Sequence, residues 1–258
     1  MQIEVRLAEI ALNNADMREV EPHIYSFRPV DESAYYDHFG GIYEVIACNR
    51  YYNRLVWGYS ISEYSRLCAD ALQSAKDEWV LDAGCGSLAF TAKTYIRHVT
   101  RPTVLFDQSV RMLRLAKSRI IKLSGSVPGN MVFVQGDVTG LPFKDRSIGT
   151  VIALNLFHAV PETGTRTMLS ELRRVMSERG SMTLTTLVKN NRLADKYIDK
   201  LGKLDALVPR SVDQLHAIFE NFGMPVKYLI KGNLAFVHHG RTLNYLGDNR
   251  FQNSGANP

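Results

Sequence analysis

The stretch Val80-Leu81-Asp82-Ala83-Gly84-Cys85-Gly86 decides the fold of this chain. A short apolar run from Trp79 ends at the acidic residue Asp82, and glycines follow at positions 84 and 86. Glycine lets the backbone turn sharply and approach a ligand, because no Cβ atom stands in the way. The stretch therefore predicts a buried strand that ends in a ligand-binding loop.

Four further apolar runs follow this strand and predict a sheet. They lie at residues 103–106, 131–134, 151–154 and 182–188. Helical segments are expected between them, over residues 87–98, 109–123 with Ser109 as N-cap, 168–176 closed by Gly180 as C-cap, and 211–222. Runs without polar alternation are typical of strands buried on both faces, so the pattern predicts a parallel sheet covered by helices on each side. The last two runs, residues 226–231 and 234–238, are separated by Gly232 and Asn233 only, which suits an antiparallel hairpin at one edge.

Composition excludes several classes of protein. The 258 residues include 31 Lys and Arg against 26 Asp and Glu, a net charge of +5. The basic residues are scattered, and the run in residues 111–122 is interpreted as a solvated helix face. The 3 cysteines are far apart, so neither a disulfide framework nor a metal site is predicted. We find no signal peptide and no apolar stretch of membrane-spanning length, and we expect a cytoplasmic location.

Aspartates stand at the tips of three successive predicted strands: Asp82, Asp107 and Asp137. Ligands of open parallel sheets lie beyond the carboxyl ends of the strands. A carboxylate at Asp107 can accept hydrogen bonds from both hydroxyls of a ribose, and Asp82 suits an ammonium group. Asp137 can accept from the exocyclic amine of an adenine. NAD-binding proteins share the strand, the glycines and the later acid, so a dehydrogenase is kept as a weaker alternative.

Four motifs in this order resemble the class I S-adenosylmethionine (SAM)-dependent methyltransferases. They occupy residues 80–87, 106–113, 135–143 and 147–154 within a similarity that covers about residues 80 to 240. The resemblance is to the small-molecule group that includes the ubiquinone and menaquinone biosynthesis enzymes. It implies a Rossmann-like, doubly wound α/β fold whose seven-stranded, mostly parallel sheet has one antiparallel edge hairpin strand.

The resemblance also implies roles for individual residues. The loop residues Asp82, Gly84, Cys85 and Gly86 would hold the methionine part of SAM, and Asn155 would lie near it. The ribose and adenine would meet Asp107, Gln108, Met112, Asp137 and Val138. One position departs from the family, because Leu88 stands where a third glycine is common. This departure leaves weak cofactor binding or a lost activity open.

The N-terminal region is expected to cover the site. Residues 1–75 would form a helical lid, residues 76–240 the methyltransferase core, and residues 241–258 a flexible tail. Seven tyrosines fall between residues 35 and 64, and Tyr36 belongs to a Tyr-Asp pair often found near the cofactor in the resembling family. Aromatic faces suit an apolar, aromatic or amine acceptor.

Transfer of a methyl group requires alignment, and a general base only if the acceptor loses a proton. His158 and His38 are the candidate bases, and for His158 the alternative is a packed histidine bonded to the backbone. The expected partner is a small-molecule acceptor, a homodimer is compatible with the sequence, and nucleic acid is not the expected partner. An RNA or protein methyltransferase, or a non-catalytic regulatory protein of the same fold, are the alternatives.

Overall fold

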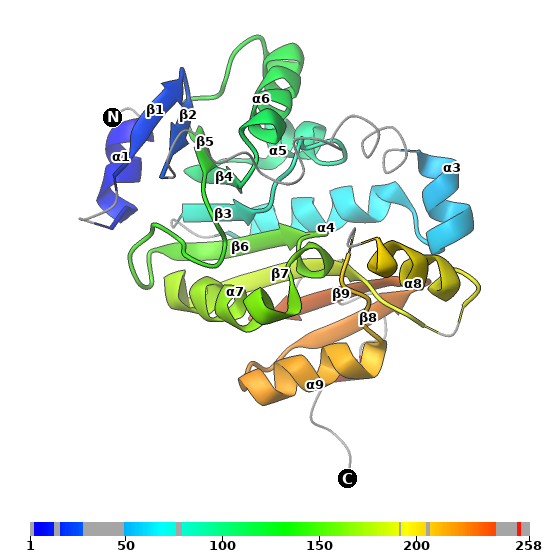
Figure 1. Cartoon of the computed structure of the whole chain (residues 1–258). Coiled ribbons are helices and arrows are strands. Elements are labelled where there is room, and N and C mark those ends of the chain that lie inside the picture. Colours follow the sequence, from blue (N-terminus) through cyan, green and yellow to red (C-terminus); the bar gives the residue numbers. More distant parts are fainter. Residues whose placement is uncertain are drawn as a thin grey trace.

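A single mixed sheet organises the molecule. The computed structural model describes residues 3–12, 16–27, 49–75, 79–190, 192–204, 207–240 and 252–253. Within these ranges ten strands follow the order β1-β2-β5-β4-β3-β6-β7-β9-β8-β10 (Figure 1). Helices lie on both faces of the sheet, as the apolar runs predict.

Seven of these strands form the predicted core. They are β3 (Trp79–Ala83), β4 (Thr103–Asp107), β5 (Met131–Gln135), β6 (Ile148–Leu154), β7 (Met176–Leu187), β8 (Lys227–Lys231) and β9 (Leu234–His239). Strands β3 to β7 pair in parallel, whereas β9 pairs antiparallel with both β7 and β8. The chain runs outward from β3 through β4 to β5, then returns to the other side of β3 at β6. The order therefore reverses at the tip of β3, where open α/β sheets bind their ligands.

The central strands are buried on both faces, and this explains why their sequences do not alternate. Val80 packs in the cluster of one face, whereas its neighbours Trp79 and Leu81 pack in that of the other. Phe133 and Val132 of β5 divide in the same way. Successive side chains of a strand point to opposite faces, so an apolar residue is needed at each position.

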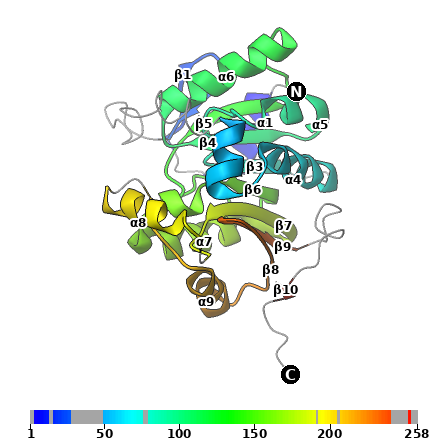
Figure 2. The same ribbon diagram turned by 90° about the vertical axis from the view of Figure 1, so that its right-hand side faces the viewer.

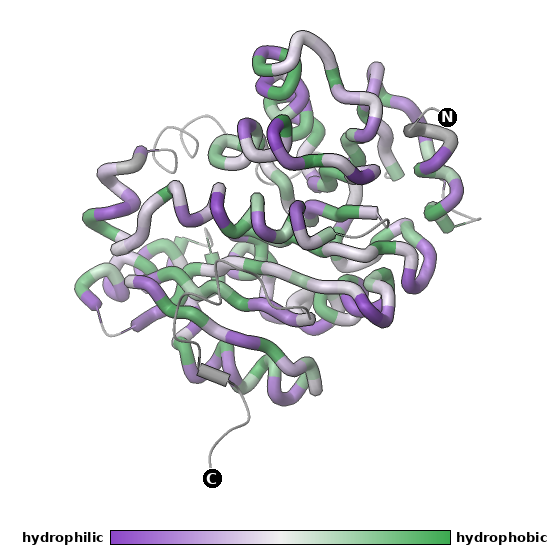
Figure 3. The backbone as a smooth tube through the Cα atoms, turned by 180° about the vertical axis from the view of Figure 1, so that it is seen from behind, coloured by the Kyte–Doolittle hydropathy of each residue, from purple (hydrophilic) through white to green (hydrophobic). Residues whose placement is uncertain are grey.

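Two layers of helices cover these faces. The helices α4 (Ile61–Ser74), α5 (Ala92–His98) and α6 (Val110–Ser124) cover one face, and α1 (Ile3–Ile10), α7 (Glu162–Val175) and α9 (Val212–Phe222) contribute to the other (Figure 2). Seen from behind, the helical turns of the tube carry both hydrophilic and hydrophobic residues, as expected for helices with one packed side (Figure 3). The predicted N-cap Ser109 accepts a hydrogen bond from the Met112 amide, and Ser211 forms a capping box at α9.

The sheet is wider than the predicted seven strands. β1 (Arg18–Glu21) and β2 (Ile24–Ser26) form a hairpin beside β5, and β10 (Gln252–Asn253) pairs with β8. Residues 18–26 are thus extended within a segment that the sequence predicted to be helical. These strands have two to four residues, which is too short for an apolar period to emerge.

Two predicted helix boundaries are wrong. Gly180 does not cap α7, because that helix ends at Val175 and the chain continues at once into β7. Gly180 lies inside this strand, where a Cβ atom would sit 2.5 Å from the side chain of Met176. Helix α5 begins at Ala92 and not at residue 87, because the backbone first turns through Leu88 with a φ of 55°.

A third cluster lies at the carboxyl edge of the sheet (Figures 1 and 2). It joins the short helices α3 (Arg50–Tyr52) and η2 (Asn53–Trp57) to α8 (Asp195–Lys203), and its aromatic members include Trp57, Tyr59 and Tyr64. Among the helices that the structure describes, none has the length and apolar character needed to span a bilayer.

Candidate cofactor and active site

The glycine loop after β3 is held against the tip of β4. The amides of Gly84 and Cys85 both donate to the carbonyl oxygen of Phe106, at 2.8 and 3.0 Å. Gly84 has a φ of 71° and Gly86 a φ of 54°, in the left-handed region that favours glycine. A Cβ atom on Gly84 would lie 2.7 Å from Leu156, whereas one on Gly86 would meet nothing within 4 Å. The loop is therefore tightly packed at its first glycine and open at its second.

Asp107 is fixed beside this loop by two backbone donors. Its Oδ2 accepts a 2.8 Å hydrogen bond from the Gly86 amide, and its Oδ1 accepts a 2.9 Å bond from the Ser109 amide. A carboxylate oxygen can accept more than one hydrogen bond. The orientation of Asp107 therefore suits a vicinal diol placed next to the loop.

Asp82 lies beneath the loop and is 2% exposed. Its Oδ2 accepts a 2.7 Å hydrogen bond from the phenol of Tyr95 on α5. Burial raises the pKa of this carboxyl to about 7, the bond from Tyr95 opposes the rise, and the charge of Asp107 adds to it. Burial also raises the pKa of the neighbouring Cys85 thiol, with Asp107 and Asp82 adding to the effect, so this side chain stays protonated.

The tip of β5 forms the third part of the site. Asp137 Oδ1 accepts hydrogen bonds from the amide and the hydroxyl of Thr139, at 2.8 and 2.7 Å, and this fixes the turn that carries Val138. Gln135 Nε2 donates to the Gln108 carbonyl at 3.1 Å, so the tips of β4 and β5 are linked. The three aspartates predicted at successive strand tips therefore lie along one edge of the sheet.

Leu88 follows the backbone path of a glycine. Its φ of 55° is left-handed, and its side chain is 2% exposed among apolar residues of α4, α5 and α6. The guanidinium of Arg119 donates a 2.6 Å hydrogen bond to the Ser87 carbonyl just before it. Leu88 thus keeps the left-handed backbone conformation that a glycine would adopt, and its side chain packs in the core.

Met112 lies within the first turn of α6 and is 7% exposed. Its amide donates to the Ser109 hydroxyl at 3.1 Å, which places it directly after the segment that carries Asp107 and Gln108. Three of the residues predicted for the ribose and the adenine, Asp107, Gln108 and Met112, therefore share one stretch of backbone at the start of α6.

Asn155, just after β6, connects the sheet to the aromatic cluster. Its φ is 59°, a region that asparagine tolerates better than most residues, and its amide donates to the Thr185 hydroxyl at 3.0 Å. Its Oδ1 accepts a 2.8 Å hydrogen bond from the phenol of Tyr64. Tyr64 in turn stacks on Phe90 at 5.6 Å and meets Tyr59 edge-on at 5.3 Å.

Tyr64 and Tyr95 were not among the predicted site residues. The abundance of tyrosines before β3 was a signal for the first of them, but it did not distinguish one tyrosine from another. Tyr95 had no sequence signal, because its bond to Asp82 depends on where α5 begins. Tyr36 and His38, which were predicted to lie in the lid, fall outside the described residues.

His158 is buried and bonded to the backbone. Its Nδ1 accepts a 3.1 Å hydrogen bond from the Leu187 amide, so the proton of the neutral ring is on Nε2. Burial, together with the smaller effect of the charge of Arg210, lowers the pKa of His158 to about 4. This geometry leaves no lone pair for proton abstraction and favours the packed alternative over the general base.

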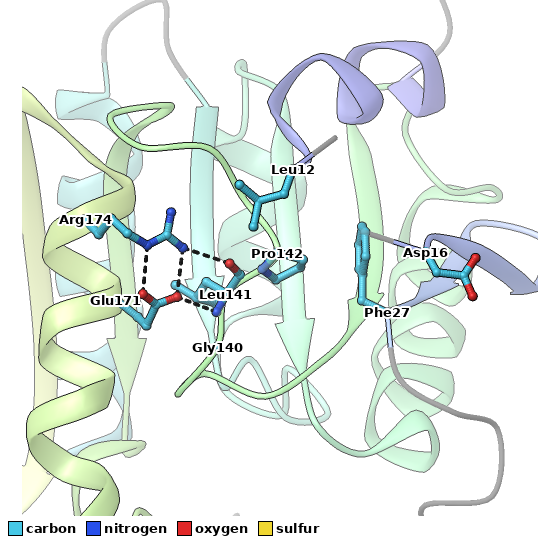
Figure 4. A pocket seen from close by; sticks show the side chains of 8 residues that line it. All are labelled: Leu12, Asp16, Phe27, Gly140, Leu141, Pro142, Glu171 and Arg174. Atoms are coloured by element: carbon cyan, nitrogen blue, oxygen red, sulfur yellow. Dashed lines mark hydrogen bonds and ion pairs between the residues drawn. The ribbon is translucent and has the colours of Figure 1, made fainter. Parts of the chain in front are cut away.

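A separate hollow of about 620 Å³ lies between α7 and the N-terminal segment (Figure 4). It shares no lining residue with the predicted cofactor site; Leu12, Phe27 and Arg174 are among its walls. The Arg174 guanidinium donates to Glu171, to Asp145 and to backbone carbonyls of the loop after β5. These bonds fasten that loop to α7, so we interpret the hollow as structural.

The sequence matches a known family over the part that builds the site. Residues 80–180 match the family described as "Methyltransferase domain". Residues 80–180 of this chain are thus a methyltransferase domain. No curated protein sequence matches the chain. The methyltransferase site fits SAM on two observations, namely the open space at Gly86 and the carboxylate of Asp107 that backbone amides orient beside it. No cluster of metal-ligating side chains occurs in the part of the chain that the structure describes.

Solved structures share the fold of this methyltransferase at low sequence identity. YcgJ from Bacillus subtilis is 21% identical, with a TM-score of 0.52 over 65% of this chain and 71% of its own. A geranyl diphosphate C-methyltransferase from Streptomyces coelicolor, solved with S-adenosyl-L-homocysteine, is 14% identical, with a TM-score of 0.56 over 69% and 76%. A possible histamine N-methyltransferase from Thermotoga maritima is 18% identical, with a TM-score of 0.53 over 78% and 98%.

Proposed function

We propose that this SAM-dependent methyltransferase methylates a small organic acceptor that is apolar, aromatic or an amine. The bond between Tyr64 and Asn155 carries the proposal, because it joins a wall of aromatic rings to the tip of β6. Leu156, the next residue, lies close to the Cβ position of Gly84 in the cofactor loop. An acceptor that packs against Phe90, the half-buried ring stacked on Tyr64, would thus lie beside the cofactor.

The cofactor-binding roles are part of this proposal. Asp107 accepts hydrogen bonds from the ribose hydroxyls, and the open face at Gly86 admits the methionine part. The amine of that part is paired by Asp82, and Asn155 lies near it. The adenine is held by residues of two strand tips, namely Gln108, Met112, Asp137 and Val138. Tyr36, which lies outside the described residues, completes the proposed set of cofactor-binding residues.

SAM, when bound, would supply a methyl group activated by its sulfonium, so that in-line attack by the acceptor on the methyl carbon would break the C–S bond and release S-adenosylhomocysteine. The residues of this chain then align the acceptor and exclude water. Phe90, which is half-buried and stacked on Tyr64, provides a flat apolar surface for this purpose. No base is required unless the acceptor must lose a proton during attack, and His158 has its Nδ1 committed to the backbone.

Two observations support the proposed class of acceptor. The motif order resembles that of the ubiquinone and menaquinone group, whose acceptors are ring compounds. Similar folds include a geranyl diphosphate C-methyltransferase and a possible histamine N-methyltransferase, one acceptor being an isoprenoid and the other an amine. Aromatic walls bind both kinds, through apolar contact and through cation–π interaction.

A calorimetric titration of the folded protein with SAM tests the first step. We expect saturable binding that Asp107→Ala weakens at least tenfold, because the ribose loses a charged acceptor. Incubation with isotope-labelled SAM and a metabolite extract would then identify the acceptor by its gain of a labelled methyl group. Absence of SAM binding in protein shown to be folded would refute the proposal.

The alternatives give different results in the same assays. An RNA methyltransferase would retain RNA at low salt and release it steeply as salt rises. A non-catalytic regulator would bind SAM but transfer no label to any acceptor. A dehydrogenase would be stabilised against heat by NAD and not by SAM.

A further inference from the structure

Large apolar side chains are exposed around the mouth of the proposed active site. The described ranges contain seven exposed large apolar residues, and four of them lie on two segments, residues 50–57 and residues 192–204. These four are Tyr51 (70% exposed), Leu55 (80%), Leu193 (89%) and Leu204 (62%). Single exposed apolar residues are common on protein surfaces, but a group of them marks an interaction site.

The two segments lie side by side. The rings of Trp57 on η2 and Tyr197 on α8 are 5.6 Å apart, and the guanidinium of Arg192 lies 3.0 Å from the Cβ position of Gly58. Both segments are at the carboxyl edge of the sheet, toward which β3 and β6 point (Figures 1 and 2). The two segments that carry the exposed side chains therefore lie at the edge of the sheet where the proposed site lies.

Basic side chains accompany the apolar ones. Exposed cations on the same two segments are Arg54, Arg192, Lys196, Lys200 and Lys203. The acids of α8 are engaged elsewhere, because Asp199 pairs with Lys189 at 3.0 Å and Asp195 accepts from the side chain of Asn233. We call these five cations and the four exposed apolar residues the mouth surface.

Helix α6 offers a contrast, since it is also basic. Its Arg114 and Lys117 pair with Glu21 at 2.9 and 3.1 Å, and its Arg119 donates to a backbone carbonyl. Its exposed apolar residues, Ile121 and Leu123, are only 38% and 42% exposed. The mouth surface thus combines greater apolar exposure with cations on a helix, α8, whose two acids bond elsewhere.

We propose that the mouth surface docks the enzyme on an anionic lipid bilayer. Apolar side chains flanked by Lys and Arg match the boundary between lipid headgroups and acyl chains. A symmetric contact with a second copy would place the same cations face to face, which is unfavourable. A nucleic acid would engage the cations but leave the leucines without an apolar partner.

Docking in this way would turn the mouth of the site toward the membrane. An apolar acceptor dissolved in the bilayer could then enter without crossing water. This last step rests on the proposed function, whereas docking itself does not, because the exposed residues and the charges define it.

Sedimentation of the full chain with lipid vesicles tests the proposal. We expect binding to vesicles of phosphatidylcholine mixed with phosphatidylglycerol, little binding to phosphatidylcholine alone, and release as salt rises. L193S/L204S should lower the apparent partition coefficient at least about tenfold by removing apolar contact. K196E/K200E should lower it at least about tenfold by reversing two charges. The matched controls L123S and K122E on α6 should leave it unchanged.

Other results would overturn the proposal. One is equal vesicle binding by the wild type and both mouth-surface variants. Another is a concentration-dependent dimer that L193S/L204S abolishes, without vesicle binding by the wild type, which would assign the surface to a second copy. SAM binding in solution, measured on the same variants, separates this test from that of the proposed function, because the mouth surface contains no proposed cofactor-binding residue.

Discussion

The phenol of Tyr95 donates a 2.7 Å hydrogen bond to the carboxylate of Asp82 beneath the cofactor loop. The pair joins α5 to β3 where burial of both side chains is almost complete, at 0% and 2% exposed. Burial raises the pKa of Asp82 to about 7 and holds the pKa of Tyr95 well above its ordinary value. The carboxyl therefore changes charge close to neutral pH, and its two forms have different consequences for stability and for binding.

Asp82→Asn should stabilise the protein without cofactor at alkaline pH. The pKa of Asp82 rises from 3.8 to about 7 on folding, so the folded state binds the proton more tightly between these values. Its contribution to stability is thus greatest at low pH and is lost as pH rises toward 7. We expect the variant to gain about 1–4 kcal/mol at pH 8, several degrees in Tm, and little at pH 4. A gain of equal size at both pH values, measured by thermal unfolding, would contradict this account.

SAM affinity should depend on pH through the same carboxyl. If Asp82 pairs with the amine of the cofactor, binding requires the ionised form. The affinity should then rise about tenfold per pH unit up to pH 7 and fall again above about pH 8, where the amine of free SAM loses its proton. Calorimetry across pH 5 to 9 measures this slope, and the slope should disappear in Asp82→Asn. A flat profile in the wild type would show that Asp82 only supports the loop.

The two loop glycines should respond differently to alanine. Gly84→Ala combines a left-handed φ with a Cβ atom 2.7 Å from Leu156, and we expect a loss of about 2–4 kcal/mol in stability together with weaker SAM binding. Gly86→Ala meets no atom, so only the cost of its φ remains, about 1–2 kcal/mol. Adding Leu156→Ala should relieve Gly84→Ala but not Gly86→Ala. Chemical denaturation of the four proteins would check this order.

Leu88→Gly should be at least as stable as Leu88→Ala. Both variants lose the buried side chain, but alanine keeps the strain of a φ of 55° and glycine does not. At an ordinary helix position glycine is about 1 kcal/mol less stable than alanine, so the expected order is the reverse of the usual one. Both should still bind SAM in calorimetry. If alanine were clearly the more stable, Leu88 would not hold the glycine conformation in solution.

His158→Asn should keep most of the activity. The asparagine Oδ1 can accept the hydrogen bond that the Leu187 amide now gives to Nδ1, whereas His158→Ala cannot and should lose about 1–3 kcal/mol of stability. Loss of a general base would lower kcat about 10²- to 10⁴-fold. Such a loss in a stable His158→Asn variant, with KM unchanged, would restore the catalytic role that the geometry disfavours.

The parts of the site that the sequence predicted are those fixed by strand ends. Asp82, Asp107 and Asp137 could be aligned because apolar runs mark where each buried strand stops. The supporting bonds to Tyr95 and Tyr64 could not be predicted, because they depend on the start of α5 and on the packing of α4 across 91 residues of sequence.

The strands of the fold can likewise be divided into those that the sequence predicts and those that it does not. The seven core strands were predictable because each is long enough to show an apolar run. The hairpin β1–β2 was not, because β1 carries the polar residues Arg18, Glu19 and Glu21, and β2 has three residues that derive their stability from pairing with β5.

That hairpin also protects the edge of the sheet against aggregation. β2 covers the edge of β5, and the charged, exposed strand β1 then becomes the outer border of the sheet. A chain shortened to begin after residue 27 would leave the amides and carbonyls of β5 unpaired along that border. Such a bare border accepts strands from other molecules and promotes fibrous aggregates. The hairpin of residues 18–26 thus protects the sheet from edge-to-edge association. Its removal should lower the solubility of the protein even where SAM binding is retained.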